Sequence, residues 1–160
     1  MSFTTSALCD KYGSTIVVAE GSLLEYYGKH KVFSGPIVTV KVYEDIGLVK
    51  KLIETAEKGS VVVVHGSGSR RSALVGKELV EAAVMRGVSG IIIYGCIRDI
   101  ALINEMDIGI LAIGTNPILS VNEGKGEQDI PVHFAGVDWV PNHYTYIDRD
   151  GILVSKDKLI

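Results

Sequence analysis

Apolar runs rich in β-branched residues recur along the chain, and they predict buried strands. The clearest runs are residues 60–65 and 91–93, in which an uninterrupted series of valines or isoleucines indicates strands buried on both faces. In the run 31–43, the step Gly35-Pro36 predicts an edge position or a bulge, because proline cannot donate to a sheet. Further strands are predicted at 15–19, 107–114, 130–135, 136–140 and 152–154.

Apolar residues three or four positions apart predict two main helices, at 44–57 and 73–86. The second helix should end at Gly87, which suits a helix C-terminus. Shorter helices are predicted at 6–12 and 100–105, and residues 21–28 are predicted to be irregular. A strand, a helix and another strand follow one another between residues 60 and 93, so the sequence predicts a mixed α/β fold with a right-handed crossover.

Composition narrows the class of protein. The 160 residues fit one domain, 1–160, with 47% hydrophobic and 22% charged residues. With a net charge of −3, the chain lacks the basic surface that drives nucleic-acid binding, so we expect no direct nucleic-acid partner.

Cys9 and Cys96 are too few for a disulfide framework. Neither a signal peptide nor a membrane span is evident, and we therefore expect a cytoplasmic protein with no membrane partner.

A glycine loop, Gly66-Ser-Gly-Ser69, follows a predicted strand and precedes a predicted helix. Such a loop can bind anions through its backbone amides, but it matches neither the P-loop nor the dinucleotide fingerprint. A tight turn is the slightly favoured interpretation, and an anion site is the alternative. Arg70 and Arg71 could belong to that site, although solvent or a subunit interface is the favoured location.

Arg98 and Asp99 follow the strand around 91–93, at a position where Gly95 is expected to turn the chain. Ligand sites of α/β proteins gather at the carboxyl ends of strands. A guanidinium offers a fork of donors to a carboxylate or an enolate oxygen, and a carboxylate is a hard ligand for a divalent cation. The alternative is a structural ion pair or a solvated turn.

Residues 76–79 allow two interpretations. If a helix begins near Gly76, the free amides of its first turn would point at a bound carboxylate. If the helix passes through Gly76, the glycine is simply tolerated in its interior.

Taken together, these segments resemble the RraA family, which includes the regulator of ribonuclease E activity A and the class II 4-hydroxy-4-methyl-2-oxoglutarate aldolases. The matching segments follow the family order over nearly the whole chain, and they are 5–10, 33–41, 44–45, 66–69, 73–76, 94–99, 107–109 and 150–155. The resemblance implies a swivelling β/β/α domain, like the phosphohistidine domains. It also implies a homotrimer, or a dimer of trimers, with clefts between the subunits.

The resemblance implies roles for individual residues. Arg98 would bind the keto and enolate oxygens of a small 2-oxo acid, and Asp99 would hold Mg²⁺ or Mn²⁺. The helix start Gly76, Lys77, Glu78 and Leu79 would bind the pyruvyl carboxylate. The implied activity is aldol cleavage to pyruvate, with oxaloacetate decarboxylation through the same enolate as a side activity.

Two positions depart from the aldolase pattern. Lys77 stands where an acid often follows the glycine, and Leu102 stands where an acid often follows the aspartate by three positions. Members that only regulate the nuclease can lack the metal aspartate, and this chain keeps Asp99, which favours an enzyme. The alternatives are a ribonuclease-binding regulator without catalytic activity and a nucleotide-binding module built on residues 66–69.

Overall fold

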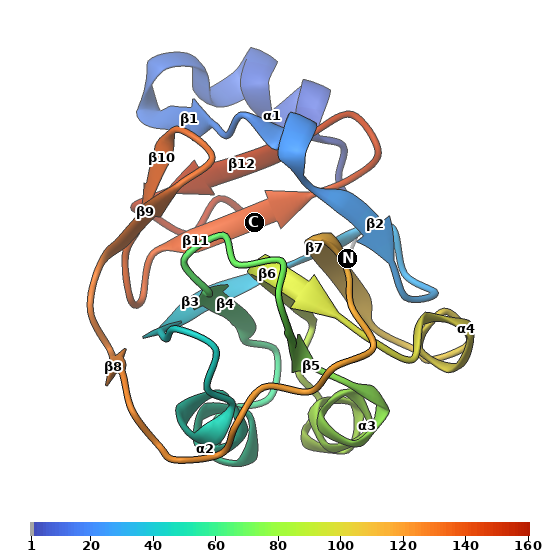
Figure 1. Cartoon of the computed structure of the whole chain (residues 1–160). Coiled ribbons are helices and arrows are strands. Elements are labelled where there is room, and N and C mark those ends of the chain that lie inside the picture. Colours follow the sequence, from blue (N-terminus) through green and yellow to red (C-terminus); the bar gives the residue numbers. More distant parts are fainter. Residues whose placement is uncertain (1) are drawn as a thin grey trace.

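The computed structural model describes residues 2–160 and confirms the predicted α/β class (Figure 1). The strands are β1 (Ile16–Val18), β2 (Glu25–Tyr27), β3 (Phe33–Lys41), β4 (Val61–His65), β5 (Ala73–Val75), β6 (Gly90–Ile97), β7 (Gly109–Thr115), β8 (Glu127–Gln128), β9 (Val132–Phe134), β10 (Val137–Trp139), β11 (Tyr144–Ile147) and β12 (Ile152–Ser155). The helices are α1 (Thr5–Tyr12), α2 (Gly47–Thr55), α3 (Lys77–Arg86) and α4 (Ile100–Ile103), with short 3-10 helices at Gly13–Thr15 and Gly21–Leu23.

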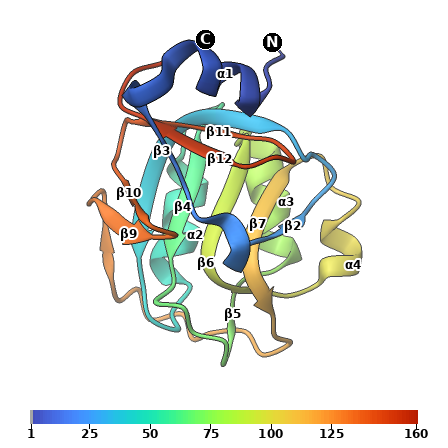
Figure 2. The same ribbon diagram turned by 90° about the horizontal axis from the view of Figure 1, so that it is seen from above.

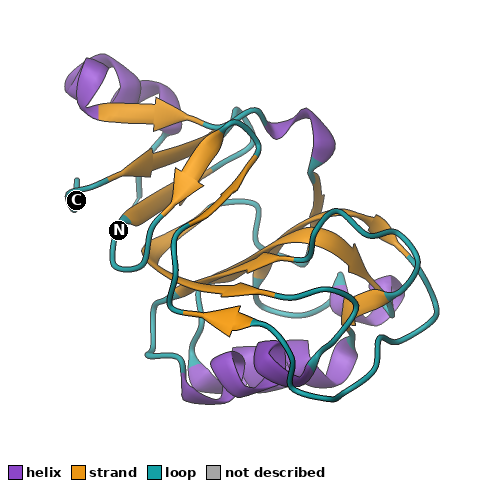
Figure 3. Ribbon diagram, turned by 60° about the vertical axis from the view of Figure 1, so that its left-hand side comes forward, coloured by secondary structure: helices purple, strands orange, loops and turns teal. Residues whose placement is uncertain are grey.

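One mixed sheet organises the molecule, in the order β1-β12-β11-β3-β4-β6-β7-β2. Its centre, β3-β4-β6-β7, is parallel, and β2 closes one side antiparallel to β7. At the other side β11, β12 and β1 are antiparallel and turn away from the parallel strands as a second layer (Figure 3). Helices α2 and α3 lie side by side against one face of the parallel strands (Figures 1 and 2).

The parallel strands are buried on both faces, as their unbroken apolar sequences predict. In β4, Val62 and Val64 belong to the core beneath α2 and α3, whereas Val61 and Val63 face a second core. The second core contains Trp139 and residues of the antiparallel strands. Side chains that alternate between the two faces of a strand thereby join the helices, the parallel strands and the antiparallel strands.

Phe33 connects the second core to the parallel strands, because its ring lies over two glycines at the starts of β6 and β7. A Cβ built on Gly90 would stand 2.2 Å from the ring, and one on Gly109 would stand 2.1 Å from it. Only glycine allows this close approach.

Strand β3 runs through Gly35-Pro36, where the sequence predicts an edge position or a bulge. The strand is continuous, and Pro36 lies where β3 changes partner, from β11 at residues 33–36 to β4 at residues 37–41. At this position the missing N–H of proline costs little, because the pairing of β3 with β11 ends here.

Several predicted boundaries were wrong. Helix α2 begins at Gly47 rather than at residue 44, because Glu44 has a left-handed φ of 51°. Strand β6 continues through Gly95 to Ile97, with a bulge near Cys96 that replaces the predicted turn. Strand β1 is an edge strand in which Val17 and Val18 are exposed, so the run 15–19 is buried only in part, at Ile16 and Ala19.

The sequence analysis missed the strands β2, β8 and β11, and it placed β5 inside a helix. Strands β2, β8 and β11 are four residues long or shorter, so none of them has a long apolar run. Among residues 2–160, none of the helices has the length and apolar character that a membrane span needs.

Candidate functional site

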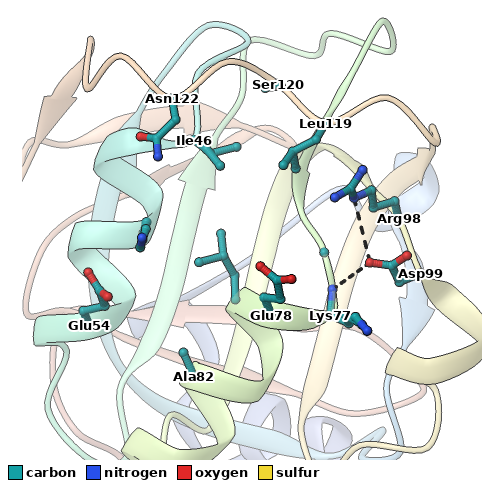
Figure 4. Close-up of a pocket in the computed structure, with 13 residues that line it drawn as sticks. Ile46, Glu54, Lys77, Glu78, Ala82, Arg98, Asp99, Leu119, Ser120 and Asn122 are labelled. Carbon is teal, nitrogen blue, oxygen red and sulfur yellow. Dashed lines mark hydrogen bonds and ion pairs between the residues drawn. The ribbon is translucent and has the colours of Figure 1, made fainter.

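A cleft of about 610 Å³ opens between α2 and α3, at the carboxyl ends of β5 and β6 (Figure 4). Its position agrees with the rule that ligand sites of α/β sheets lie beyond the carboxyl ends of parallel strands. The cleft brings together every predicted site residue, and these are Gly76, Lys77, Glu78, Leu79, Arg98 and Asp99.

Helix α3 begins at the edge of this cleft. Gly76 is extended, with φ −129° and ψ −170°, and the first helical bond runs from the Val80 amide to the Gly76 carbonyl at 3.1 Å. The amides of Glu78 and Leu79 therefore have no partner within the helix, and no other acceptor in residues 2–160 replaces it. Of the two interpretations left open for Gly76, the helix start is confirmed.

The predicted helix 73–86 is correspondingly wrong over its first residues. Ala73–Val75 form the short strand β5, which pairs with the end of β6 through Ala73 and Cys96 and through Val75 and Ile97. These three residues are almost fully buried. Burial between sheet neighbours outweighs the helix propensity of an alanine and a leucine.

Arg98 lies directly beyond β6, and its backbone amide donates to the Val75 carbonyl at 3.0 Å. The side-chain Nη1 donates to the Pro117 carbonyl at 3.3 Å. Its Nε is shielded from solvent and has no acceptor among residues 2–160. Because buried donors are nearly always satisfied, this N–H is a candidate for binding a ligand oxygen.

Asp99 adopts the left-handed conformation, with φ 63°. Its carboxylate turns away from the start of α4 and reaches α3, where Oδ2 accepts from the Lys77 amide at 3.0 Å. The same oxygen lies 3.8 Å from the Arg98 Nε (Figure 4), and no donor in residues 2–160 reaches Oδ1. A non-glycine residue held at positive φ beside a cleft is typical of functional positions.

Gly76 permits this arrangement by close approach. A Cβ at this position would stand 3.0 Å from the Asp99 Oδ2 and 3.2 Å from the Arg98 Nε. The absence of a side chain therefore lets both charged groups pack against the start of α3.

The ligands for a divalent cation are few. No group of three or more His, Cys, Asp or Glu side chains converges within residues 2–160. Asp99 offers one free carboxylate oxygen. Mg²⁺ commonly takes one or two carboxylates and completes its shell with water and substrate oxygens, so this single carboxylate fits an ion of that kind.

The two departures from the aldolase pattern lie outside the centre of the cleft. Lys77 lines the cleft, but its side chain points away from Glu78 (Figure 4). Leu102 lies on α4 and is 53% exposed. The Lys77 ammonium forms no ion pair with Asp99 in the described chain, and the partners of the Asp99 carboxylate are the Lys77 backbone amide and the Arg98 Nε.

The opposite wall of the cleft was missed by the sequence analysis. It consists of α2, which contributes Lys50 and Glu54, and of a segment that contributes Leu119 and Asn122. No local motif marks these residues, because two separate stretches of the chain meet here.

Asp45 holds this wall in place. Its Oδ1 accepts from the amides of Gly47, Glu123 and Gly124 at 2.9–3.1 Å, and its Oδ2 accepts from Lys125 at 3.1 Å. Burial alone would raise the pKa of Asp45, but the four backbone N–H groups outweigh it and lower the pKa below its usual value.

The glycine loop 66–69 is a tight turn, as the favoured interpretation predicted. All four of its amides have acceptors inside the protein: the Tyr94 carbonyl for Gly66 and Gly68, the His65 ring for Ser67 and the Gly66 carbonyl for Ser69. Loop and cleft are separate, because none of these four residues lines the cleft. No amide of the loop is left for a phosphate.

The two arginines after the loop bind protein groups. Arg71 is exposed, as predicted, and its guanidinium donates to both oxygens of Glu44 at 2.8 Å. Arg70 donates to the Ile113 carbonyl at 3.0 Å. The Arg71 guanidinium and the Ser69 hydroxyl lower the pKa of Glu44 to about 2.

Fold and cleft thus define a mixed α/β protein with a small charged cleft at the carboxyl ends of its parallel strands. The chain belongs to the RraA-like family, whose model, described as Aldolase/RraA, matches residues 5–154.

Three proteins similar to this chain carry three kinds of name. A protein of Arabidopsis thaliana named "Putative 4-hydroxy-4-methyl-2-oxoglutarate aldolase 3" is 43% identical over 98% of this chain and 97% of its own. A structure from Geobacillus kaustophilus HTA426, titled as an S-adenosylmethionine:2-dimethylmenaquinone methyltransferase, has 47% identity, covers 98% of this chain and 97% of its own, and gives a TM-score of 0.96. The RNA-processing inhibitor RraA from Thermus thermophilis has 34% identity, covers 100% of this chain and 96% of its own, and gives a TM-score of 0.94.

Proposed function

We propose that this protein is a divalent-metal-dependent aldolase that cleaves 4-hydroxy-4-methyl-2-oxoglutarate to pyruvate and also decarboxylates oxaloacetate. The observation that carries the proposal is the set of unpaired groups at one end of the cleft. These are the Arg98 Nε, the free Asp99 oxygen and the amides of Glu78 and Leu79. Several curated relatives, at 41–43% identity, are named for this aldolase.

The unpaired groups suit the head of a 2-oxo acid. The carboxylate of such an acid would accept from the amides of Glu78 and Leu79, where the helix dipole favours negative charge. The keto oxygen would then face the Arg98 guanidinium. Both contacts use donors that have no other acceptor in the described chain.

Both reactions pass through the same enolate. In the aldol cleavage, the 4-hydroxyl loses its proton, the C3–C4 bond breaks, and its electron pair forms the enolate of pyruvate. In the decarboxylation, the pair comes from the bond to carbon dioxide. In either case C3 finally takes a proton, and Arg98 would stabilise the charge on the enolate oxygen as it develops.

Asp99 would hold the cation, Mg²⁺ or Mn²⁺. A bound cation supplies Lewis-acid stabilisation of negative charge on the substrate oxygen. The hydrogen bond from the Lys77 amide fixes Oδ2, which orients Asp99 and leaves Oδ1 directed at its ligand.

The methyltransferase name of the Geobacillus structure finds less support in this cleft. Its lining includes no aromatic side chain, and so it offers no ring on which an adenine could stack. The glycine loop, which could have approached a nucleotide, has no free amide.

Asp99→Asn tests the proposal, because it keeps the size of the side chain and removes its charge. We expect pyruvate release to require Mg²⁺ or Mn²⁺, to stop with a chelator, and to fall on the order of a hundredfold in this variant. Asp107→Asn is the matched control, since Asp107 is exposed outside the cleft and should leave the rate unchanged. Metal-independent cleavage, or no turnover of any 2-oxo acid by the wild type, would contradict the proposal.

A second candidate function is the binding of a ribonuclease of the E type, supported by the likeness to the Thermus RNA-processing inhibitor. This function would depend on the surface and not on the cleft. Asp99→Asn should then leave ribonuclease inhibition intact, whereas charge reversals at exposed residues such as Arg71 should reduce it. The absence of inhibition at micromolar concentrations of this protein would count against this function. The homotrimer that the resemblance implies stays a prediction.

A further inference from the structure

We propose that Lys50, assisted by Asn122, binds the distal carboxylate of the substrate and makes the cleft selective for 2-oxo dicarboxylates. This inference rests on the proposed function, because it assumes that the 2-oxo acid head binds at the start of α3. It concerns the opposite wall of the cleft, which no predicted site residue reaches.

Three cationic side chains line the cleft: Lys50, Lys77 and Arg98. Arg98 is committed to the end of the cleft next to Asp99. The side chain of Lys77 points away from Glu78 and from the middle of the cleft (Figure 4). Lys50 is therefore the cation that remains for a second anionic group.

The Lys50 ammonium has no partner of its own in the described chain. Glu54, one turn further along α2, could form an ion pair with it, but no such pair is present among residues 2–160. Exposed ion pairs of this type are weak, so even a transient pair with Glu54 would compete little with a carboxylate for Lys50. Burial of that carboxylate inside the cleft would strengthen the new contact.

Asn122 supplies a second donor on the same wall. Its Oδ1 lies on the side of Gly47, 3.1 Å from where a Cβ of that glycine would stand. In Figure 4 the amide nitrogen lies on a different side from the oxygen and is directed down along α2. The backbone next to Asn122 is fixed by the bonds from Glu123 and Gly124 to Asp45, so the main chain that carries this donor is held in position.

The two walls therefore match the two ends of one small molecule. One end offers backbone amides and a guanidinium to a 2-oxo acid, and the other offers an ammonium and an amide to a second carboxylate. A volume of about 610 Å³ accommodates a five- or six-carbon dicarboxylate with its water. A monocarboxylate such as pyruvate would use only the first end.

Lys50→Met tests this assignment, with Lys51→Met as the matched control on the exposed side of the same helix. We expect the KM for oxaloacetate and for 4-hydroxy-4-methyl-2-oxoglutarate to rise about tenfold or more in Lys50→Met, because one charge-assisted hydrogen bond is lost. The kcat for 4-hydroxy-4-methyl-2-oxoglutarate, which keeps its distal carboxylate throughout the cleavage, should stay within about twofold, and the inhibition constant of pyruvate should not change. Lys50→Arg should restore most of the affinity.

A binding experiment separates this inference from the proposed function. Calorimetry with 2-oxoglutarate, which has two carboxylates and no bond to cleave, should show the same tenfold loss in Lys50→Met, whereas pyruvate affinity stays constant. If neither the wild type nor the variants turned over a substrate, the proposed function would be rejected, but the role of Lys50 would not. Equal KM and affinity in Lys50→Met and Lys51→Met, an equal loss for pyruvate, or no binding of 2-oxoglutarate to the wild type would overturn the role of Lys50.

Discussion

Two glycine-containing segments follow strands that both pair with β6, and only one of them has backbone amides without an acceptor in the described chain. Residues 66–69 follow β4 and look more like an anion-binding loop, with two glycines and two serines. Residues 76–79 follow β5 and contain a single glycine. Yet the first segment has all its amides bonded inside the protein, whereas the second leaves the amides of Glu78 and Leu79 free.

The difference lies in the acceptors that the fold places nearby. The Tyr94 carbonyl, on the adjacent strand β6, accepts from two amides of the loop 66–69. At residues 76–79 the chain enters a helix, whose first turn has no internal acceptors. Glycine content therefore does not mark an anion site. What marks it is an amide without an acceptor, and that depends on the neighbouring strand.

Asp45 and the segment 123–125 extend the comparison, and they give the largest expected effect on stability. Here a buried carboxylate plays the part that a bound anion plays elsewhere, because it accepts from four amides. Asp45→Ala would remove every one of these acceptors. We expect the free energy of unfolding to fall by about 3 kcal/mol, as measured by urea denaturation, since a buried charged acceptor is lost.

Asp45→Asn sharpens this prediction. The amide oxygen can keep the three bonds of Oδ1, but the new NH₂ group would face the Lys125 amide, so the loss should be intermediate between wild type and Asp45→Ala. Because folding lowers the pKa of Asp45, its contribution should be present above the unfolded pKa of about 3.8 and be lost as the pH falls below it. Equal stability of all three proteins would show that the four bonds contribute nothing net.

Alanine at two glycines should separate activity from stability. Gly76→Ala would push its Cβ against Asp99 and Arg98, and a shift of a few tenths of an ångström there should lower kcat/KM about tenfold with little change in melting temperature. Gly68→Ala would place a side chain at φ 69°, against the Tyr94 hydroxyl, and should cost about 1 kcal/mol of stability. Its activity should be unchanged. The opposite pattern in the two variants would break the comparison between the segments.

The sequence predicted most of the fold because the parallel strands have unmistakable patterns. A run of β-branched residues such as Val61–Val64 is typical of a strand buried on both faces, and α2 presents Val49, Leu52 and Ile53 at helical spacing. Where the pattern is short, the prediction failed. Ala73–Val75 read as the start of α3, because only pairing with β6 makes them a strand.

The candidate site was predictable in part for the same reason. Arg98 and Asp99 come directly after a strong strand, so their place at its carboxyl end follows from local sequence. The left-handed Asp99, whose carboxylate reaches an amide 22 residues away, does not follow from it. Lys50 and Asn122 could not be predicted, because their wall exists only once Asp45 has joined α2 to a segment about 80 residues further on.

The smallest expected effect concerns Glu44 and Arg71, which both bond to Ser69 of the loop 66–69. Arg71 and Ser69 lower the pKa of Glu44 to about 2 from its usual 4.5. The pair therefore stabilises the folded state above pH 4.5, and this contribution should decline between about pH 4.5 and pH 2 as Glu44 takes up a proton. Carboxyl NMR titration measures the pKa directly, and Arg71→Met should return it toward its usual value. Inorganic phosphate should shift neither this titration nor the amide signals of residues 66–69. If phosphate displaced Glu44 from Arg71 at millimolar concentrations, the loop would be an anion site after all, and the contrast with the start of α3 would be one of degree.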